Sequence, residues 1–388
     1  RDLGGLADVE HILHELSDLA VSVIEQTLYY LQQHTMELLG LPRNADGEVQ
    51  KMLVLAMGKL GGRELKFYSD IDLIFAYADQ GTTEGGRRLS NHEFFLRLAR
   101  KLVRVLDEIT ADGFVYRVDT RLRPNGDSGP LAMNFNAMEQ YYQLQGRDWE
   151  RYAMIKARII AGTETDREYL ASMLRPFTYR RYLDFGAFES IREMKGMIEA
   201  EVRRKSMKDN IKLGSGGIRE IEFIGQTFQL IRGGPMPELQ QRSILKVLSL
   251  LAEFGYLESG EAEDLGNSYL FLRKLENRLQ MERDQQTQVL PRDALSRERI
   301  RLAMGFDDWE GLMQALDRHR EAVTRVFDSV ISSEEQPETD AIHSLQLFWA
   351  DADNRDNLVH WLDLSGSDNS AEIVDALAGF RRSARIRT

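Results

Sequence analysis

Residues 57–77 read "MGKLGGRELKFYSDIDLIFAY", and this stretch decides what kind of sheet the chain builds. Its glycine-rich beginning predicts a turn, and its apolar end predicts a buried strand with Asp70 and Asp72 at the start. Residues two apart on a strand share a face, so the two carboxylates should project the same way from Cα atoms roughly 6.5 to 7 Å apart. Burying two such charges is costly, and they would take up protons unless a cation neutralised them.

A third aspartate adds to this pair. Asp119 lies in "FVYRVDTRLRP", residues 114–124, where the alternation predicts another strand with arginines two residues before and after the aspartate on the same face. Magnesium prefers oxygen ligands, and three carboxylates on adjacent strands can seat two ions about 3.5 to 4 Å apart for phosphoryl or nucleotidyl transfer. We therefore predict a catalytic site in which Asp70, Asp72 and Asp119 hold two Mg²⁺ ions.

Two glycine turns are candidates for holding phosphate. In the first, Gly58, Gly61 and Gly62 would let the backbone approach a ligand and turn its N–H groups toward it. In the second, "GSGG" at residues 214–217 follows Lys212 and precedes a predicted helix, whose first N–H groups would bind an anion. Each observation has an ordinary alternative. Glycine turns are commonly tight turns only, a lone Asp-x-Asp is commonly a surface feature, and basic side chains on a helix are commonly solvated.

The remaining periodicity predicts an α+β fold that is α-helical for most of its length. Short apolar runs predict the strands of a small mixed sheet at residues 51–58, 70–77, 114–124 and 130–135. Helical spacing covers residues 7–39 and 90–113, and from residue 136 onward it covers nearly every segment, including 137–160 and 190–207. We divide the chain into a helical segment 1–48, a catalytic domain 49–165, a helical domain 166–331, and an acidic linker with terminal helices 332–388.

Composition excludes several kinds of site. The chain of 388 residues is 43% hydrophobic and 29% charged, which is typical of a soluble globular protein. It contains no cysteine, which excludes disulfides, zinc–cysteine sites and thiol catalysis. The apolar run at residues 52–57 is far shorter than the roughly 20 residues that cross a bilayer, and the net charge of −12 argues against nucleic acid as a partner. We expect a cytoplasmic protein without membrane contacts, and Arg1 in place of methionine suggests a fragment or a processed start.

Several motifs, in order, resemble one known family. They are "GKLGG", "SDIDLIF", "VYRVDTRLRP", "GRDWERYAMIKAR" and "IKLGSGGIREIEF", and the resemblance runs from about Leu53 to Leu290. They resemble the glutamine synthetase adenylyltransferase family, bifunctional enzymes with two nucleotidyltransferase domains of the DNA polymerase β type. The last two motifs are similar to the N-terminal half of that family, since the C-terminal half typically has an aspartate where this chain has Glu220.

The resemblance implies an activity. The N-terminal half of these enzymes removes AMP from a tyrosine of glutamine synthetase: inorganic phosphate attacks the AMP group, and ADP is released. Tyrosine leaves as a phenolate of pKa about 10, which a metal ion can stabilise, so no protein nucleophile is needed. The predicted nucleotide- and phosphate-binding residues are Gly58, Lys59, Gly61, Gly62, Ser69, Arg121, Arg123, Lys156, Lys212, Gly216, Gly217 and Glu220.

Two other functions remain open at this point. The same chemistry run in reverse would make the chain a transferase that places AMP from ATP on the tyrosine, and a chain without catalysis would be a docking or regulatory module. The resemblance implies four partners: adenylylated glutamine synthetase, the PII signalling protein in its uridylylated form, inorganic phosphate, and ADP or ATP.

Overall fold

The computed structural model describes residues 1, 6–86, 88–180, 209–283, 286–333, 359 and 373–375 of the chain. The chain divides into two compact units, Arg1–Thr324 and Arg325–Thr388. Every element described below lies in the first unit, apart from the last turns of one helix. Within that unit we refer to residues 6–180 as the sheet region and to residues 209–324 as the helical region.

The sheet region contains a small mixed sheet, as the sequence predicts. Its strands are β1 (Leu41–Arg43), β2 (Met52–Ala56), β3 (Ile71–Tyr77), β4 (Thr82–Glu84), β5 (Val118–Asp119), β6 (Ala132–Asn134) and β7 (Arg158–Ala161). Strands β5, β3, β2 and β7 lie side by side in that order. Strand β3 runs antiparallel to β2 and parallel to both β5 and β6, which pair with its beginning and its end. Strands β1 and β4 form a separate antiparallel pair.

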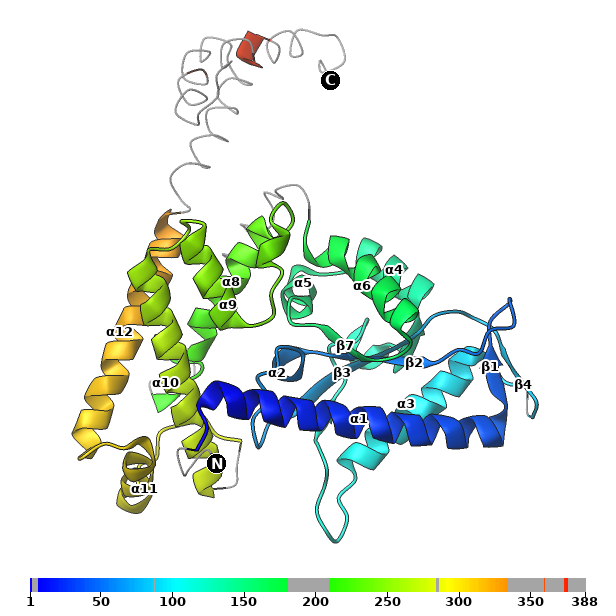
Figure 1. The fold of residues 1–388 in the computed structure, drawn as a ribbon, viewed down its shortest axis with the longest axis horizontal. Helices are drawn as coiled ribbons and strands as arrows, with labels where there is room; N and C mark the ends of the chain where they lie inside the picture. Colours follow the sequence, from blue (N-terminus) through cyan, green and yellow to red (C-terminus); the bar gives the residue numbers. More distant parts are fainter. Residues whose placement is uncertain are drawn as a thin grey trace. The chain divides into compact units, whose positions relative to one another are not determined.

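Helices cover both faces of this sheet (Figure 1). They are α1 (Val9–Leu39), α2 (Gly58–Gly61), α3 (Asn91–Asp107), the short 3-10 helix η1 (Gly126–Ser128), α4 (Phe135–Leu144), α5 (Asp148–Met154) and α6 (Glu164–Thr178). On one face α1 and α3 pack against Val54 and Phe75, and on the other α4, α5 and α6 pack against Leu55 and Ile74. Because β2 and β3 are buried on both faces, they read as continuous apolar runs.

Helix α3 begins where the sequence predicts and ends earlier. Ser90 and Glu93 form a capping box, in which each side chain accepts a hydrogen bond from the other residue's backbone N–H. The predicted continuation to Gly113 is wrong, because the helix ends at Asp107. Ile109, inside the stretch that the spacing predicts to be helical, lies beyond the last turn and is 80% exposed.

The helical region confirms that the fold is mostly α-helical. Its elements are α8 (Ile218–Arg232), the 3-10 helix η3 (Pro237–Leu239), α9 (Ile244–Glu253), α10 (Ser259–Arg283), α11 (Ala294–Met304) and α12 (Trp309–Ser333). The long helix α10 packs against α8, α9 and α11, and it also contacts α1 of the sheet region. Residues 1–324 therefore form one unit, and the finer four-part division of the chain stays a prediction.

Two predicted elements differ from the structure. Residues 137–160 do not form one helical stretch, because the chain turns after α4 and α5 and then adds β7 to the open edge of β2. A four-residue strand is too short for periodicity to distinguish it from a helix. The strand predicted over residues 114–124 is wrong in extent: only Val118 and Asp119 pair with β3. The residues after Asp119 turn away, and the chain returns to β3 at β6.

Two sequence predictions concern segments that the structure does not describe, and a third concerns membrane spans. The helix predicted at residues 190–207 and most of the linker at 332–340 lie outside the described residues. None of the described helices combines the length and the apolar character that a membrane span requires.

Candidate active site

A cavity of about 370 Å³ brings the predicted site together with residues that the sequence did not single out. From the predicted set, it is lined by Gly58, Lys59, Asp70, Asp72, Lys156 and Lys212. The other lining residues are Leu122, Tyr152, Ala153, Glu222, Gln226, Arg273 and Gln286. The sheet region and the helical region both contribute side chains, so the site is assembled from distant parts of the chain.

Asp72 is held at the start of β3 beside Asp119. The two residues are direct partners in the parallel pairing of β3 with β5. Burial raises the pKa of the Asp72 carboxyl to about 6, and the negative charge of Asp119 contributes to the same shift. A carboxyl group in this setting favours a nearby cation, because a positive charge would offset both effects.

Asp70 lies one residue ahead of the strand, and one oxygen of its carboxylate is left open by the residues that the structure describes. Its Oδ1 atom is buried without a hydrogen bond among the described residues, and its Oδ2 atom lies 3.5 Å from Nε2 of Gln286. A buried oxygen without a donor is costly unless water or an ion meets it. Asp70 and Asp72 thus present oxygen atoms to one cavity, and that donor chemistry fits Mg²⁺.

Asp119 already has a cationic partner. Nε of Arg121 donates to its Oδ2 at 3.0 Å, and the backbone N–H of Arg121 donates to its Oδ1 at 2.8 Å. The side-chain hydrogen bond from Arg121 lowers the pKa of Asp119 and keeps it ionised. Within the described residues, no three acidic or histidine side chains surround a common point closely enough to hold a metal ion. The Arg121 side chain is 72% exposed and lies outside the set of residues that line the cavity.

The first glycine turn is a short helix packed close to the aspartates. Gly58 has a φ of +52°, and a Cβ atom on it would lie 2.9 Å from Oδ2 of Asp72. Gly61 is needed for a different reason, because a Cβ there would lie 2.0 Å from the carbonyl oxygen of Lys156. Gly62 is looser, with the nearest atom of Glu64 at 3.3 Å. Gly58 is therefore the glycine that lets backbone and carboxylate meet at the cavity.

Lys59 and Ser69 meet at the mouth of this turn. Nζ of Lys59 donates to Oγ of Ser69 at 3.2 Å, and that Oγ also accepts the backbone N–H of Lys66. Burial lowers the pKa of Lys59 to about 8. Ser69 is buried and does not line the cavity, so it positions Lys59 rather than facing a ligand.

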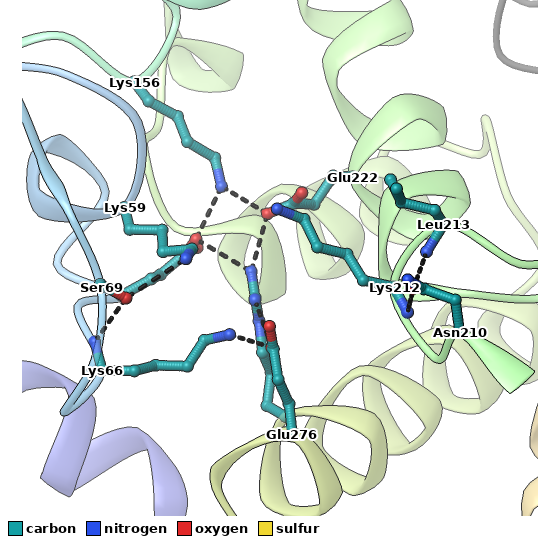
Figure 2. Close-up of polar contacts among 11 residues, drawn as sticks. Lys59, Lys66, Ser69, Lys156, Asn210, Lys212, Leu213, Glu222 and Glu276 are labelled. Atoms are coloured by element: carbon teal, nitrogen blue, oxygen red, sulfur yellow. Dashed lines mark hydrogen bonds and ion pairs between the residues drawn. The ribbon is translucent and has the colours of Figure 1, made fainter. Parts of the chain in front are cut away.

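Lys156 lines the cavity but its charge is already balanced. Nζ of Lys156 lies 2.6 Å from Oε2 of Glu64 and 2.8 Å from Oε1 of Glu222 (Figure 2). Burial alone would lower the pKa of Lys156, but the charges of Glu222 and Glu64 outweigh burial and raise it. Since Glu222 belongs to α8 and Glu64 to the sheet region, Lys156 joins the two regions.

Helix α10 continues this set of buried charges. Arg273 lies 2.9 Å from Glu222 and 3.0 Å from Glu276, and Lys66 of the sheet region pairs with the same Glu276. Figure 2 shows the chain of contacts that runs from Lys156 through Glu222 to Glu276. Buried charges require partners of this kind, because an unpaired one carries a large desolvation cost.

Backbone N–H groups of the second glycine turn, residues 214–217, already donate hydrogen bonds to nearby residues of the same segment. The N–H of Gly216 donates to Oε2 of Glu220 at 2.9 Å, and the N–H of Gly217 donates to the carbonyl of Gly214. Gly216 has a φ of +67°, and a Cβ on it would lie 2.4 Å from the Cα atom of Arg320 in α12. These three predicted residues therefore hold the turn against α12 and do not line the cavity, whereas Lys212 ahead of them does.

Arg123 is also engaged in local structure. Its Nη1 donates to the carbonyl of Thr120 at 2.8 Å, and its Nε donates to the carbonyl of Gly129 at 3.2 Å. The side chain is 11% exposed and holds the turn between β5 and β6. It does not line the cavity.

Sequence reasoning missed the cavity residues that come from helices. Helical geometry shows that Glu220 and Glu222 point in different directions, so only one of them can face a given site. The structure places Glu222 at the cavity. Tyr152 lies inside the motif at residues 146–158 but was not singled out there. Arg273 carried no motif signal, although a buried arginine inside an apolar helical pattern indicates a buried ion pair.

Comparison with known proteins agrees with the motifs. Residues 1–172 match the family described as glutamate-ammonia ligase adenylyltransferase, and residues 192–331 match the family described as GlnD PII-uridylyltransferase. The chain is 51% identical, over 392 aligned positions, to a bifunctional glutamine synthetase adenylyltransferase/adenylyl-removing enzyme of Nitrosococcus oceani. The alignment covers 100% of this chain and 40% of that protein. The chain therefore spans less than half the length of this curated relative.

Proposed function

Residues 1–172 match the glutamate-ammonia ligase adenylyltransferase family, and from this premise we propose that the chain is a member of it and removes AMP from an adenylylated tyrosine of glutamine synthetase. The reaction is a phosphorolysis. An oxygen of inorganic phosphate forms a bond to the phosphorus of AMP, the bond from that phosphorus to the tyrosine oxygen breaks, and the proton of the phosphate passes to the tyrosine. The products are ADP and unmodified glutamine synthetase.

One observation carries this proposal: two aspartates and several cationic side chains line the same cavity. Asp70 and Asp72 are the acidic side, and a buried oxygen of Asp70 has no protein donor among the described residues. Asp119 pairs with Asp72 in the sheet and completes the set. These three residues would hold Mg²⁺ once Asp119 releases Arg121 and turns toward the cavity, because their carboxylates do not converge on one point in the described structure. The bound ion would supply charge stabilisation for the phosphoryl oxygens and the leaving phenolate.

The chain's own residues supply binding and position. Gly58 allows the backbone of α2 to approach Asp72 closely, so a ligand at the cavity meets the carboxylates and the helix together. The part of the chain that the structure describes lines this cavity with neither serine nor histidine, which fits direct attack by phosphate without a protein nucleophile. A partly enclosed site also favours phosphate over water as the attacking group, provided that phosphate is held by cations.

The opposite direction is the second candidate. A transferase that places AMP from ATP on the same tyrosine would use the same carboxylates, since both reactions pass through the same phosphorus centre. The resemblance of the motifs at residues 146–158 and 211–223 to the N-terminal half of the family favours removal. A docking module without catalysis is the third candidate, and the buried, unpartnered oxygen of Asp70 argues for a working site instead.

An isotope experiment separates these functions. The chain is incubated with adenylylated glutamine synthetase, Mg²⁺ and radiolabelled inorganic phosphate, and the nucleotides are separated. Label in ADP, together with loss of AMP from glutamine synthetase, supports phosphorolysis. A second incubation with unmodified glutamine synthetase and ATP labelled in its α-phosphate tests transfer. Label on the protein in that arm, with none in ADP in the first, would assign the reverse reaction.

Regulation by a PII protein is part of the same proposal. Residues 192–331 match a family named for uridylylating PII, and the motifs resemble enzymes that respond to uridylylated PII. We expect the chain to bind uridylylated PII more tightly than unmodified PII. Calorimetric titration of the chain with the two PII forms tests this, and equal affinities would remove PII from the proposal.

A further inference from the structure

The cationic side chains at the cavity fall into two groups. Lys156 contacts two carboxylates and Arg273 contacts three, so both charges are already balanced. Lys59 and Lys212 line the same cavity, yet among the described residues no carboxylate lies within 4 Å of either ammonium group. Within the described residues, the cavity therefore has two cations without a direct ion-pair partner, and the carboxylates of Glu276 and Glu222 act on Lys59 only from a longer distance.

Lys59 approaches from the sheet region. It stands in α2, directly after Gly58, and its only side-chain hydrogen bond within the described residues is to the neutral hydroxyl of Ser69. A hydroxyl orients an ammonium group but does not neutralise it. Leaving a partly buried charge in this state is unfavourable unless an anion binds there.

Lys212 approaches from the helical region, on a backbone that is fixed. Its N–H donates to Oδ1 of Asn210 at 2.9 Å, and its carbonyl accepts the N–H of Arg219 at 3.1 Å. Figure 2 shows the side chains of Lys59 and Lys212 extending toward the same central space from opposite sides. Their charges are close enough that Lys212 contributes, after burial, to the low pKa of Lys59. Two like charges held in this way attract an anion of double charge.

We propose that Lys59 and Lys212 together form a binding site for a phosphate dianion, which holds inorganic phosphate before the reaction and the terminal phosphate of ADP after it. This assignment rests on the proposed phosphorolysis, because the phosphate that attacks becomes the terminal phosphate of the product. A lysine ammonium is a compact point charge that suits phosphate oxygens, and two of them match the charge of the dianion.

The other predicted cations are excluded by their contacts. Arg121 is paired with Asp119, Arg123 is used by the turn around Thr120, and Lys156 is held between Glu64 and Glu222. Since Asp70 and Asp72 line the same cavity as the two free lysines, the phosphate would lie beside the carboxylates that hold the metal. The site needs one lysine from each region, so it is complete only when the sheet and helical regions are packed together.

Direct binding tests the site without catalysis. The whole chain, in buffer with EDTA, is titrated with inorganic phosphate, with ADP and with AMP by isothermal titration calorimetry. The variants are Lys59→Gln and Lys212→Gln, and Lys246→Gln on the exposed face of α9 is the matched control. We expect each cavity variant to weaken phosphate binding by about tenfold or more, while the control binds as the wild type does. ADP should lose affinity in the same variants and AMP should not, since AMP lacks the terminal phosphate.

The outcomes separate this site from the proposed function. Lys212 is partly exposed, so wild-type phosphate affinity in Lys212→Gln would overturn the site even if Lys59→Gln fails to fold. Absence of phosphate binding by the wild-type chain would overturn it as well. If labelled phosphate enters ADP but Lys212→Gln leaves the KM for phosphate unchanged, the site is wrong and the reaction stands. If phosphate binding depends on both lysines but no ADP forms from adenylylated glutamine synthetase, the site stands and the reaction is wrong.

Discussion

Lys66 and Glu276 form an ion pair in which neither side chain is exposed to solvent. Lys66 lies between α2 and β3 in the sheet region, and Glu276 lies on α10, so the pair joins the two regions beneath the cavity. Burial alone would raise the pKa of Glu276, but the charges of Lys66 and Arg273 outweigh burial and lower it to about 2. The Glu276 carboxylate is therefore ionised at neutral pH. If this carboxylate is removed, the buried charges of Lys66 and Arg273 lose a counter-charge, and keeping them buried becomes costly.

Removing that carboxylate should destabilise the chain strongly. In Glu276→Gln the buried ammonium of Lys66 has no carboxylate, and we expect a loss of about 3 to 5 kcal/mol in the free energy of unfolding. The double variant Lys66→Met with Glu276→Leu should recover much of this loss, because no unpaired charge remains at that pair. Urea unfolding followed by circular dichroism measures both. Glu108→Gln, which breaks an exposed pair with Arg104, is the control and should change little. A similar loss in the single and double variants would contradict the explanation.

The carboxylates of the site should matter for activity and not for folding. Asp70→Asn and Asp119→Asn each remove an oxygen ligand, and we expect the rate of ADP formation to fall by about a hundredfold or more, as it should when EDTA removes Mg²⁺. Asp112→Asn, in an exposed turn, is the control. Rates are measured with labelled phosphate, and thermal unfolding reports folding. Full activity in both site variants would remove the metal site and favour the docking function.

Gly58→Ala should damage the site through one contact. The added methyl group would meet Oδ2 of Asp72, so we expect loss of activity in addition to a cost of about 1 to 3 kcal/mol for the positive φ. Gly47→Ala separates the two effects, because Gly47 has a φ of +81° and open space around its Cβ position. If Gly47→Ala reduces activity as much as Gly58→Ala does, backbone strain and not the contact with Asp72 is the cause.

Lys156 and Lys212 should differ in their effect on stability. Lys156→Met leaves Glu64 and Glu222 buried, with Arg273 as the one cation within 4 Å of them in the part of the chain that the structure describes. We expect a loss of about 3 kcal/mol or more in the free energy of unfolding. Lys212→Gln removes a charge without a carboxylate partner, so the change should stay within about 0.5 kcal/mol. Urea unfolding of the two variants checks the order. The reverse order would show that the charge of Lys212, and not that of Lys156, is balanced by the fold.

Anion binding should weaken as pH rises through about 8. Burial lowers the pKa of Lys59 to that value, so its ammonium group is mostly charged at pH 7 and mostly neutral at pH 9. Sulfate is a suitable probe, because it remains a dianion over this range. We expect the sulfate affinity of the wild type to fall between pH 7 and pH 9, and that of Lys59→Arg to fall less, since arginine stays charged. A pH profile that is identical in the two proteins would show that Lys59 does not control binding.

Local signals predicted the parts of the fold that local interactions determine. Strand β3 follows from its apolar run, and α3 begins at a capping box that is visible in four residues. Strand β7 and the short β5 depend instead on which edges of the sheet remain open, and a single sequence does not show those edges. The same limit explains why residues 114–124 were expected to form a longer strand.

The residues of the site also divide into those that local sequence predicts and those that depend on tertiary structure. The aspartates were predictable because two carboxylates at the start of a buried strand require an electrostatic explanation. The sequence predicted Lys156 as a phosphate-binding cation but gave no sign of its partners, because Glu64 and Glu222 lie 92 and 66 residues away in the chain. The choice between Glu220 and Glu222 depends on which face of α8 packs toward the sheet region, and that choice comes from tertiary structure.

The buried charges that join the two regions also limit how related proteins can exchange parts. Consider a chimera that takes α8 and α10 from one relative and the sheet region from another. It would contain Glu222 and Glu276, but its sheet region could have other residues in place of their partners Lys156 and Lys66. Each mismatch would leave a charge in a dry interface, which costs far more than a mismatch between apolar side chains. These positions should therefore be inherited as a set, and a working hybrid must be cut so that the whole set comes from one parent.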